Sequence, residues 1–297
     1  MFLVKKPLTI GVRTVYFEKK INYLQQASSP KFVLLAGSNG RLSHRCETFE
    51  QILDMPCINM SVSADMALDY QFEKLKPFLN SGDIVYLPVE YNFFRGGKAE
   101  LRAGTDLPFM LSYDHHSLAK ASPTKQLESV FYPNLRYLFA GLGEMTLARA
   151  GIKRRINPDS LTAQGDEAGH TLERSKPYRE YLNSLNWTPP DENSVVANSP
   201  KAKIISDFLV WGENNNVKVI GGLPTTFNDQ PVPDTLVAKL SAFYKSKNQV
   251  FLSMANKSQY PRSHFFDTPY HLSEEYQIKH SVSIAEMIKA HFYQPAD

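Results

Sequence analysis

The sequence predicts an α/β protein with a flavodoxin-like, three-layer α/β/α fold, in which helices cover both faces of about five parallel strands. Short apolar runs alternate with helical segments in residues 31–90, and the same alternation resumes in residues 200–292. Such runs are typical of strands that are buried on both faces of a parallel sheet, and the helices between them supply the crossover connections. The composition agrees, because 42% of the 297 residues are hydrophobic, which suffices for a large core.

The first half of the sheet is predicted from three apolar runs. Runs that end in turn residues predict strands at 32–36, 57–60 and 84–89. The intervening and preceding patterns predict helices at 15–26, 42–53 and 64–79. Strand, helix, strand, helix, strand at this spacing is a βαβαβ unit, which places the three strands parallel in one sheet.

The second half of the sheet follows residue 200. Apolar runs predict strands at 217–220 and 249–252, and helical patterns occur at 202–214, 234–245 and 273–292. Asp234 stands where an N-cap would begin the middle one of these helices. For the complete sheet we predict the strand order 2-1-3-4-5.

We divide the chain into one core domain and two additions. Residues 1–30 form an N-terminal helical extension, and residues 31–90 and 200–292 form the α/β domain. Residues 91–199 interrupt that domain with irregular sequence, which includes a helical pattern at 133–150. An insertion of this length is too long for a plain loop in a compact domain. It is a lid, a substrate-binding subdomain or a packing extension without a function, and the sequence leaves these three open.

Charge and cysteine content argue against several classes of protein. The net charge is +3 and no long run of Lys or Arg occurs, so we expect no nucleic-acid partner. The two cysteines, Cys46 and Cys57, belong to no C-x-x-C or Cys/His cluster, so we expect no metal and no other cofactor. We interpret both as reduced, partly buried thiols.

The sequence leaves the cellular compartment open. No stretch approaches the roughly 18 apolar residues that a membrane-spanning helix needs. Residues 1–13 carry two lysines and a proline within their apolar patch, which is not typical of a signal peptide. The chain is either cytoplasmic or the soluble part of a periplasmic or cell-envelope protein, and we favour the second.

Polar side chains that suit catalysis gather where the predicted strands end. Ligands of open parallel sheets bind at the carboxyl ends of the strands. In chain order, these ends carry Ser38, Asn39 and Arg41; Asn59, Ser61 and Ser63; Glu90, Tyr91 and Asn92; Thr225 and Thr226; and His264, Asp267, Tyr270 and His271. The set contains a nucleophile, amide donors, a base and acids, so we place the candidate active site at this edge.

Ser38 and His271 are the candidate nucleophile and base. Ser38 follows an apolar strand and lies between Gly37 and Gly40, which let the backbone turn sharply and leave the hydroxyl exposed. A Gly-Ser turn alone is more typical of a helix cap than of a nucleophile. His271 lies just before the last helix, with Asp267 upstream. We predict that one ring nitrogen of His271 contacts the Ser38 hydroxyl and that Asp267 binds the other, as in serine hydrolases.

Short blocks at these strand ends resemble those of the SGNH/GDSL hydrolase superfamily. Residues 36–40, Ala-Gly-Ser-Asn-Gly, are similar to its nucleophile block, in the form of the DltD-like and alginate-acetylation-type proteins of bacterial cell envelopes. Asp267 and His271 are similar to its terminal Asp-x-x-His block, with one residue more between them. Ser61 stands where the family has an oxyanion glycine, and residues 87–92 stand in place of a Gly-x-Asn-Asp block.

The resemblance implies a serine esterase or O-acyltransferase that acts on acyl groups, above all acetyl, of a cell-envelope or secreted polysaccharide. It implies oxyanion donors at Ser38 and Ser61, with a side-chain donor from Asn39 or Asn92. We expect further substrate contacts from Arg41, Glu90, Tyr91 and Tyr270. The implied partners are the acyl ester or carbohydrate and a membrane-bound acyl donor protein. The alternative, favoured by the missing Gly-x-Asn-Asp block, is an inactive SGNH-fold protein that binds or assembles polysaccharide.

Overall fold

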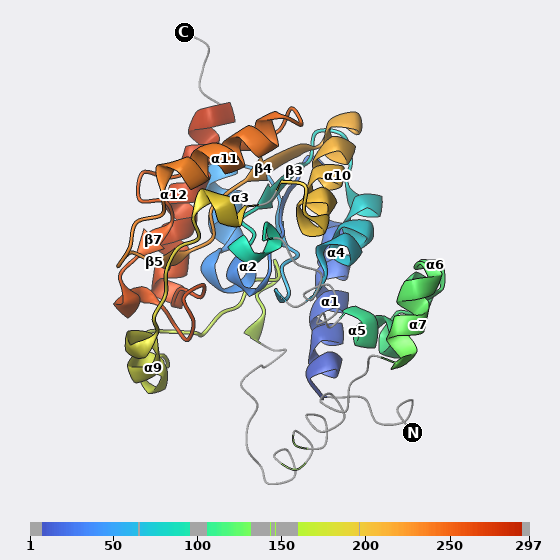
Figure 1. Ribbon diagram of the computed structural model, residues 1–297, viewed down its shortest axis with the longest axis horizontal. Helices are drawn as coiled ribbons and strands as arrows, with labels where there is room; N and C mark the ends of the chain where they lie inside the picture. The colour runs from blue at the N-terminus through green and yellow to red at the C-terminus, as the bar shows by residue number, and fades with distance from the viewer. Residues whose placement is uncertain are drawn as a thin grey trace.

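A computed structural model describes most of the chain as an α/β protein (Figure 1). The described residues are 8–64, 66–95, 106–131, 143, 146, 160–195 and 197–292. Except for residues 143 and 146, the helix predicted at 133–150 lies outside them. Five parallel strands form the central sheet, with helices on both faces. This confirms the predicted three-layer α/β/α fold.

The central sheet has the predicted strand order. Its strands are β1 (Phe32–Leu34), β2 (Cys57–Asn59), β3 (Ile84–Leu87), β4 (Lys218–Gly221) and β6 (Val250–Phe251). They lie in the order β2-β1-β3-β4-β6, which is 2-1-3-4-5 in chain order, and every pairing is parallel. All carboxyl ends therefore meet at one edge, where the nucleophile and base were predicted.

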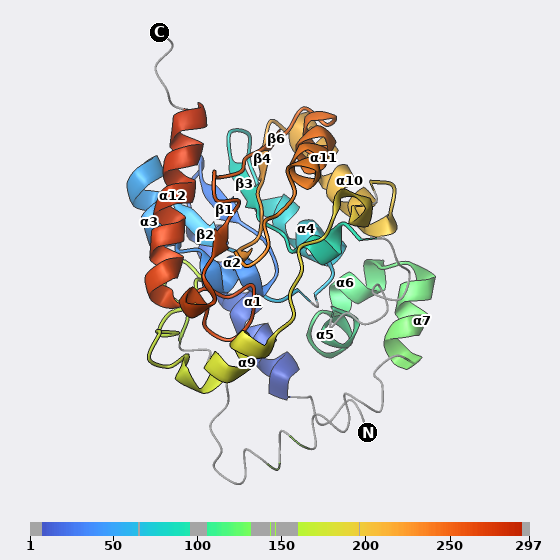
Figure 2. The same cartoon turned by 60° about the vertical axis from the view of Figure 1, so that its left-hand side comes forward.

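Alternate residues of each strand face different helical layers, as the two-residue period of a strand requires. Val33, Val85 and Val219 pack on one face with a first group of helices. That group is α1 (Leu8–Gln26), α4 (Leu68–Leu75), α10 (Pro200–Asn214) and α11 (Asp234–Lys245). Phe32 and Tyr86 face the opposite layer, made by α3 (Cys46–Leu53) and α12 (Glu274–Phe292). Figure 2 shows the two layers on either side of the sheet.

The helix predicted at 42–53 is instead two helices, α2 (Ser38–Ser43) and α3. The chain between them is extended at His44 and Arg45. The N–H of Arg45 donates to the Ser281 hydroxyl of α12 at 2.7 Å, in place of a helical carbonyl. This tertiary contact ends α2 and re-aims the chain, which a local hydrophobic pattern does not predict.

Two smaller differences from the predicted elements lie in the second half. Asp234 is the first residue of α11, and the N-cap position is occupied by Pro233. A second sheet, of β5 (Thr226–Phe227) and β7 (Gln259–Tyr260), joins the loops that follow β4 and β6. Two-residue strands are too short to show a period in the sequence.

The described part of the insertion lies in two places. Three helices, α5 (Asp106–Tyr113), α6 (His115–Lys120) and α7 (Pro123–Phe131), pack together beside α1, away from the sheet (Figures 1 and 2). Residues 160–195, which include α9 (Arg179–Ser184), return to the α/β domain. There the N–H of Glu167 donates to the carbonyl of Arg41 at 3.1 Å, so this end of the insertion is built into the support of α2.

Cys46 and Cys57 form a disulfide bond, so the prediction of two reduced thiols is wrong. Cys46 begins α3 and Cys57 begins β2, and the short helix–turn connection between them brings their Cα atoms to 5.2 Å. Both cysteines are buried. Among the described helices, none combines the length and the apolar character required to cross a membrane.

Candidate active site

The structure brings Ser38, His271 and Asp267 together in a hydrogen-bonded chain. Nε2 of His271 lies 2.8 Å from the Ser38 hydroxyl. Nδ1 of the same ring lies 2.6 Å from Oδ1 of Asp267. The predicted contacts on both ring nitrogens are therefore confirmed. The four-residue spacing between Asp267 and His271 does not prevent the hydrogen bond between these two side chains. In this arrangement an imidazole can take the serine proton while a carboxylate fixes its tautomer.

Ser38 is held at the edge of the sheet by the turn that leads from β1 into α2. The turn passes so close to its neighbours that Gly37 has no room for a side chain. A Cβ at Gly37 would collide with Oε1 of Glu90 and would lie 2.7 Å from Cα of Ala64. Glycine is thus required here for close approach of the backbone. The turn leaves Ser38 as the first residue of α2, with its hydroxyl partly exposed.

Glu90 lies beneath this turn and does not reach the substrate side, so its predicted role as a substrate contact is wrong. The side chain is buried, and its two carboxylate oxygens accept the N–H groups of Gly37, at 3.0 Å, and Asn39, at 3.1 Å. Burial raises the pKa of the Glu90 carboxyl, against the opposing effects of these N–H donors and of His271. The carboxylate is part of the support of the nucleophile.

His271 is held by hydrogen bonds to the main chain on both of its sides. Oγ of Ser43 lies 2.9 Å from the carbonyl oxygen of Tyr270 and accepts the N–H of Leu272 at 3.0 Å. Oγ1 of Thr225 also lies 3.0 Å from the Tyr270 carbonyl oxygen. Ser43 and Thr225 are fully buried. These contacts connect the loop of His271 with α2, which carries Ser38.

Buried apolar side chains also anchor this loop. Phe265 and Leu272 are fully buried in one hydrophobic cluster, and Phe265 packs edge-on against Phe227 with ring centroids 4.8 Å apart. An isolated antiparallel bridge pairs Phe265 with Leu272. His271 therefore sits in a tight turn between two buried side chains, which keeps the imidazole in place.

Two of the predicted oxyanion donors are engaged elsewhere. The side-chain amide of the buried Asn39 donates to the carbonyl of Pro88 at 2.8 Å, and its oxygen accepts the N–H and hydroxyl of Thr225. The N–H of Ser61 donates to Oδ1 of Asn59 at 3.0 Å. Both groups complete local networks, so the predicted oxyanion roles of Asn39 and Ser61 are wrong.

Two other predicted donors remain available. Within the described residues, the main-chain N–H of Ser38 makes no hydrogen bond. The side chain of Asn92 is partly exposed and has no hydrogen-bond partner among those residues. The main-chain carbonyl oxygen of Asn92 accepts a hydrogen bond from Nζ of Lys201 at 3.1 Å. Ser38 and Asn92 are therefore the candidates for oxyanion stabilisation.

Arg41 and Tyr91 are engaged within the protein. The Arg41 guanidinium pairs with Glu167 at 3.1 Å and lies over the Tyr16 ring, with its carbon 5.0 Å from the ring centroid. Tyr91 is buried in the main core, and this burial raises the pKa of its hydroxyl. The predicted substrate contacts of both are wrong. Tyr270 remains partly exposed beside His271 and stays a candidate contact.

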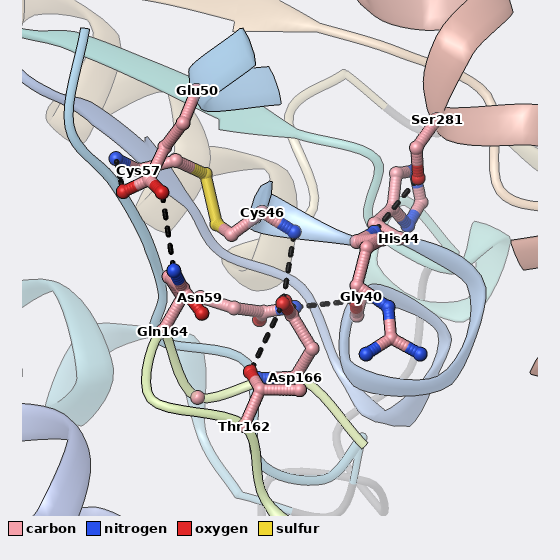
Figure 3. The surroundings of a disulfide bond; sticks show 12 residues. Gly40, His44, Cys46, Glu50, Cys57, Asn59, Thr162, Gln164, Asp166 and Ser281 are labelled. Atoms are coloured by element: carbon pink, nitrogen blue, oxygen red, sulfur yellow. Dashed lines mark hydrogen bonds between the residues drawn. A yellow bond between two sulfur atoms is a disulfide. The ribbon is translucent and has the colours of Figure 1, made fainter. Parts of the chain in front are cut away.

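A buried network behind α2 was not predicted, and it includes a residue from the insertion. Asp166 accepts the N–H of Cys46 and the Nδ2–H of Asn59, each at 2.8 Å. The same Asn59 nitrogen donates to the carbonyl of Gly40 in α2 at 2.8 Å (Figure 3). Asp166 is 120 residues from Cys46 in sequence. No local pattern signals such a contact, although Asn59 was found as a strand-end residue.

The site offers no cluster of metal ligands, and comparison with known proteins adds no name. Within the residues that the structure describes, no group of three or more His, Cys, Asp or Glu side chains is placed to hold a metal ion. The chain matches no model of a known protein family, and a search of curated proteins finds no match.

Proposed function

We propose that this protein is a serine hydrolase or acyltransferase that uses Ser38 as its nucleophile. The observation that supports the proposal most directly is the chain of two hydrogen bonds from Ser38 through His271 to Asp267. Three side chains in this order, at the carboxyl edge of a parallel sheet, form the unit that activates a serine hydroxyl in many unrelated folds.

In the proposed reaction, Ser38 Oγ attacks the carbonyl carbon of an acyl ester while Nε2 of His271 takes the hydroxyl proton. Asp267 accepts the Nδ1–H and stabilises the imidazolium. The N–H of Ser38 binds the oxyanion, with the Asn92 side chain as the second donor. When the intermediate collapses, His271 returns the proton to the leaving alcohol. Water or an acceptor hydroxyl, activated by His271, then takes the acyl group from Ser38.

We further propose O-acyl groups of a cell-envelope or secreted polysaccharide as the substrate class, with a membrane-bound acyl donor protein as partner. This rests on the resemblance of the blocks around Ser38 and His271 to the SGNH superfamily. The disulfide of Cys46 and Cys57 supports an exported location, because such bonds persist in oxidising compartments and are rare in the cytosol.

A second candidate function is that of an inactive SGNH-fold protein which binds polysaccharide. The engagement of Asn39 and Ser61 in local networks favours it, because both were expected to complete the oxyanion site. An incomplete oxyanion site would leave the chain with a serine–histidine pair but with little stabilisation of the transition state.

A fluorophosphonate probe, which reacts with activated serines, separates the two functions. We expect the parent protein to be labelled at Ser38 and to hydrolyse p-nitrophenyl acetate. Ser38→Ala and His271→Ala should each abolish labelling and reduce hydrolysis to the background rate, because each removes a member of a unit that acts together. An unlabelled parent that still binds polysaccharide would refute the enzyme and support the binding protein.

A further inference from the structure

We propose that Glu90 is a positioning residue for the nucleophile, whose negative charge and two oxygens hold the turn around Ser38 in its reactive form. The inference rests on the proposed function, because it assigns Glu90 a part in activating the same serine. Glu90 does not touch the reacting atoms. It binds the peptide groups on either side of them.

The contacts of Glu90 leave the peptide N–H of Ser38 free while they engage both of its neighbours. One carboxylate oxygen accepts the N–H of Gly37 and the other accepts the N–H of Asn39. These two hydrogen bonds fix the two peptide groups that flank the one carrying the N–H of Ser38. The intervening N–H of Ser38, the candidate oxyanion donor, makes no hydrogen bond in the described structure.

A carboxylate satisfies this geometry and an amide does not. Two N–H donors approach two different oxygens of one buried group, so both atoms must be acceptors. The isosteric glutamine has one oxygen and one NH₂ group, and the NH₂ would face a main-chain N–H with no acceptor between them. A buried N–H left without a partner costs about 1–3 kcal/mol, so the turn of a Gln variant would shift to relieve the contact.

The position of Glu90 also matches the charge that develops in the reaction. When His271 accepts the proton of Ser38 it becomes positive. Attraction to a positive His271 opposes the burial that raises the pKa of the Glu90 carboxyl. A Glu90 carboxylate in turn attracts the imidazolium.

The same strand carries a matched control at its other end. Asp83 precedes β3 and Glu90 follows it, and both carboxylates are buried. Asp83 also accepts two main-chain N–H groups, from Lys31 at 3.0 Å and from Asn80 at 2.9 Å. It lies at the amino end of the strand, away from Ser38. Asp83→Asn therefore disturbs comparable hydrogen bonds, and it also breaks the buried ion pair with Lys31 at 2.8 Å, without touching the nucleophile turn.

The test compares Glu90→Gln and Asp83→Asn by the rate and the final extent of Ser38 labelling. Molecules that never fold lower the final extent of labelling, and reversible unfolding lowers the rate only in proportion to the unfolded fraction, which urea denaturation measures. A displaced nucleophile in a folded molecule lowers the rate and keeps the full extent. For Glu90→Gln we expect full labelling at a rate about 100-fold lower, the cost of a ~1 Å misplacement. Hydrolysis of p-nitrophenyl acetate should lose kcat by a similar factor, with KM nearly unchanged.

Asp83→Asn should keep the parent labelling rate and kcat, whatever it loses in stability. Glu90→Asp, which keeps the charge on a shorter side chain, should recover part of the rate that Glu90→Gln loses. Equal labelling rates in Glu90→Gln and the parent would overturn the positioning role and leave the proposed function intact. Absence of Ser38-dependent labelling in the parent would overturn both.

Discussion

At the scale of single residues, the most informative contacts are those of the Ser43 hydroxyl with the main chain on either side of His271. Ser43 binds the carbonyl before His271 and the N–H after it. The position of the imidazole therefore depends on a side chain that never meets the substrate. Catalytic groups must be held within fractions of an ångström, and hydrogen bonds from surrounding residues provide that precision.

We predict that Ser43→Ala lowers kcat by about 10- to 100-fold, because the loop that carries His271 loses its link to α2. Kinetics of p-nitrophenyl acetate hydrolysis measures this. Ser199→Ala is the matched control, because Ser199 is also buried and accepts the N–H of Ala202 at 3.2 Å at the start of α10, away from the base. Both variants should lose about 1–3 kcal/mol of stability, since each leaves a buried N–H unpaired. Equal kcat values in the two variants would contradict the role of Ser43.

At the scale of secondary-structure elements, the site depends on how α2, α3 and β2 are tied together. The disulfide joins the first residue of α3 to the first residue of β2. Beside it, Asp166 binds Cys46 and Asn59, and Asn59 binds the carbonyl of Gly40 in α2. A segment of the insertion thus completes the support of the nucleophile helix. Residues 160–167 act as part of the scaffold, whatever the function of the rest of the insertion.

We predict that replacing both cysteines by alanine lowers the free energy of unfolding by about 2–3 kcal/mol. The two cysteines are 11 residues apart, and closing a short loop of this kind restricts the unfolded chain by about that amount. Urea denaturation measures the change. A reducing agent should bring the parent to the stability of the double variant and should leave the variant unaltered. If reduction does not alter the parent, the thiols are not paired in solution.

At the scale of the whole molecule, the central fold follows from the sequence because its signals are local. The five strands are apolar runs and the triad residues stand at their ends, so strand order and parallel topology bring Ser38 and His271 to one edge. What the sequence does not predict depends on contacts between distant segments. Examples are the break between α2 and α3, which Ser281 causes, and the support that Asp166 provides.

Four of the wrong site assignments have one physical cause. The residues stand at strand ends, as predicted, but their side chains point into the protein: Glu90, Asn39, Arg41 and Tyr91. Position along a strand determines the edge at which a residue lies. It does not determine whether the side chain faces the substrate or the packed interior, because that depends on neighbours that arrive from elsewhere in the chain. Polar residues at such an edge can hold the site in place from the interior as well as form its surface.

Buried histidines make the stability of the whole molecule sensitive to acid. Burial lowers the pKa of His44 to about 3, and His280 beside it is also shifted down by burial. Between about pH 6.5 and pH 3 the unfolded chain therefore binds a proton at His44 that the folded protein does not bind. Stability falls as the pH falls through this window, by up to about 1.4 kcal/mol per pH unit for each such histidine.

We predict that His44→Phe makes the free energy of unfolding less dependent on pH between 6.5 and 4.5. Phenylalanine keeps an aromatic ring beside Phe49 and Tyr86, and it removes the titrating group. His116→Gln is the control, because His116 is exposed, and it should leave the slope of the parent unaltered. Urea denaturation across this range gives the slopes. Parallel slopes for His44→Phe and the parent would show that His44 is not buried as a neutral side chain.

The separation of Ser38 from its base has a consequence for synthesis of the protein. Ser38 and His271 are 233 residues apart in the chain. A ribosome translates the serine 233 residues before the histidine, so a growing polypeptide has no partner for Ser38 at position 271 until the chain beyond β6 has been added. If Ser38 is the nucleophile that we propose, chains truncated or stalled before residue 271 lack an activated serine. Reactivity at Ser38 would then report only molecules that have been translated through residue 271 and have folded.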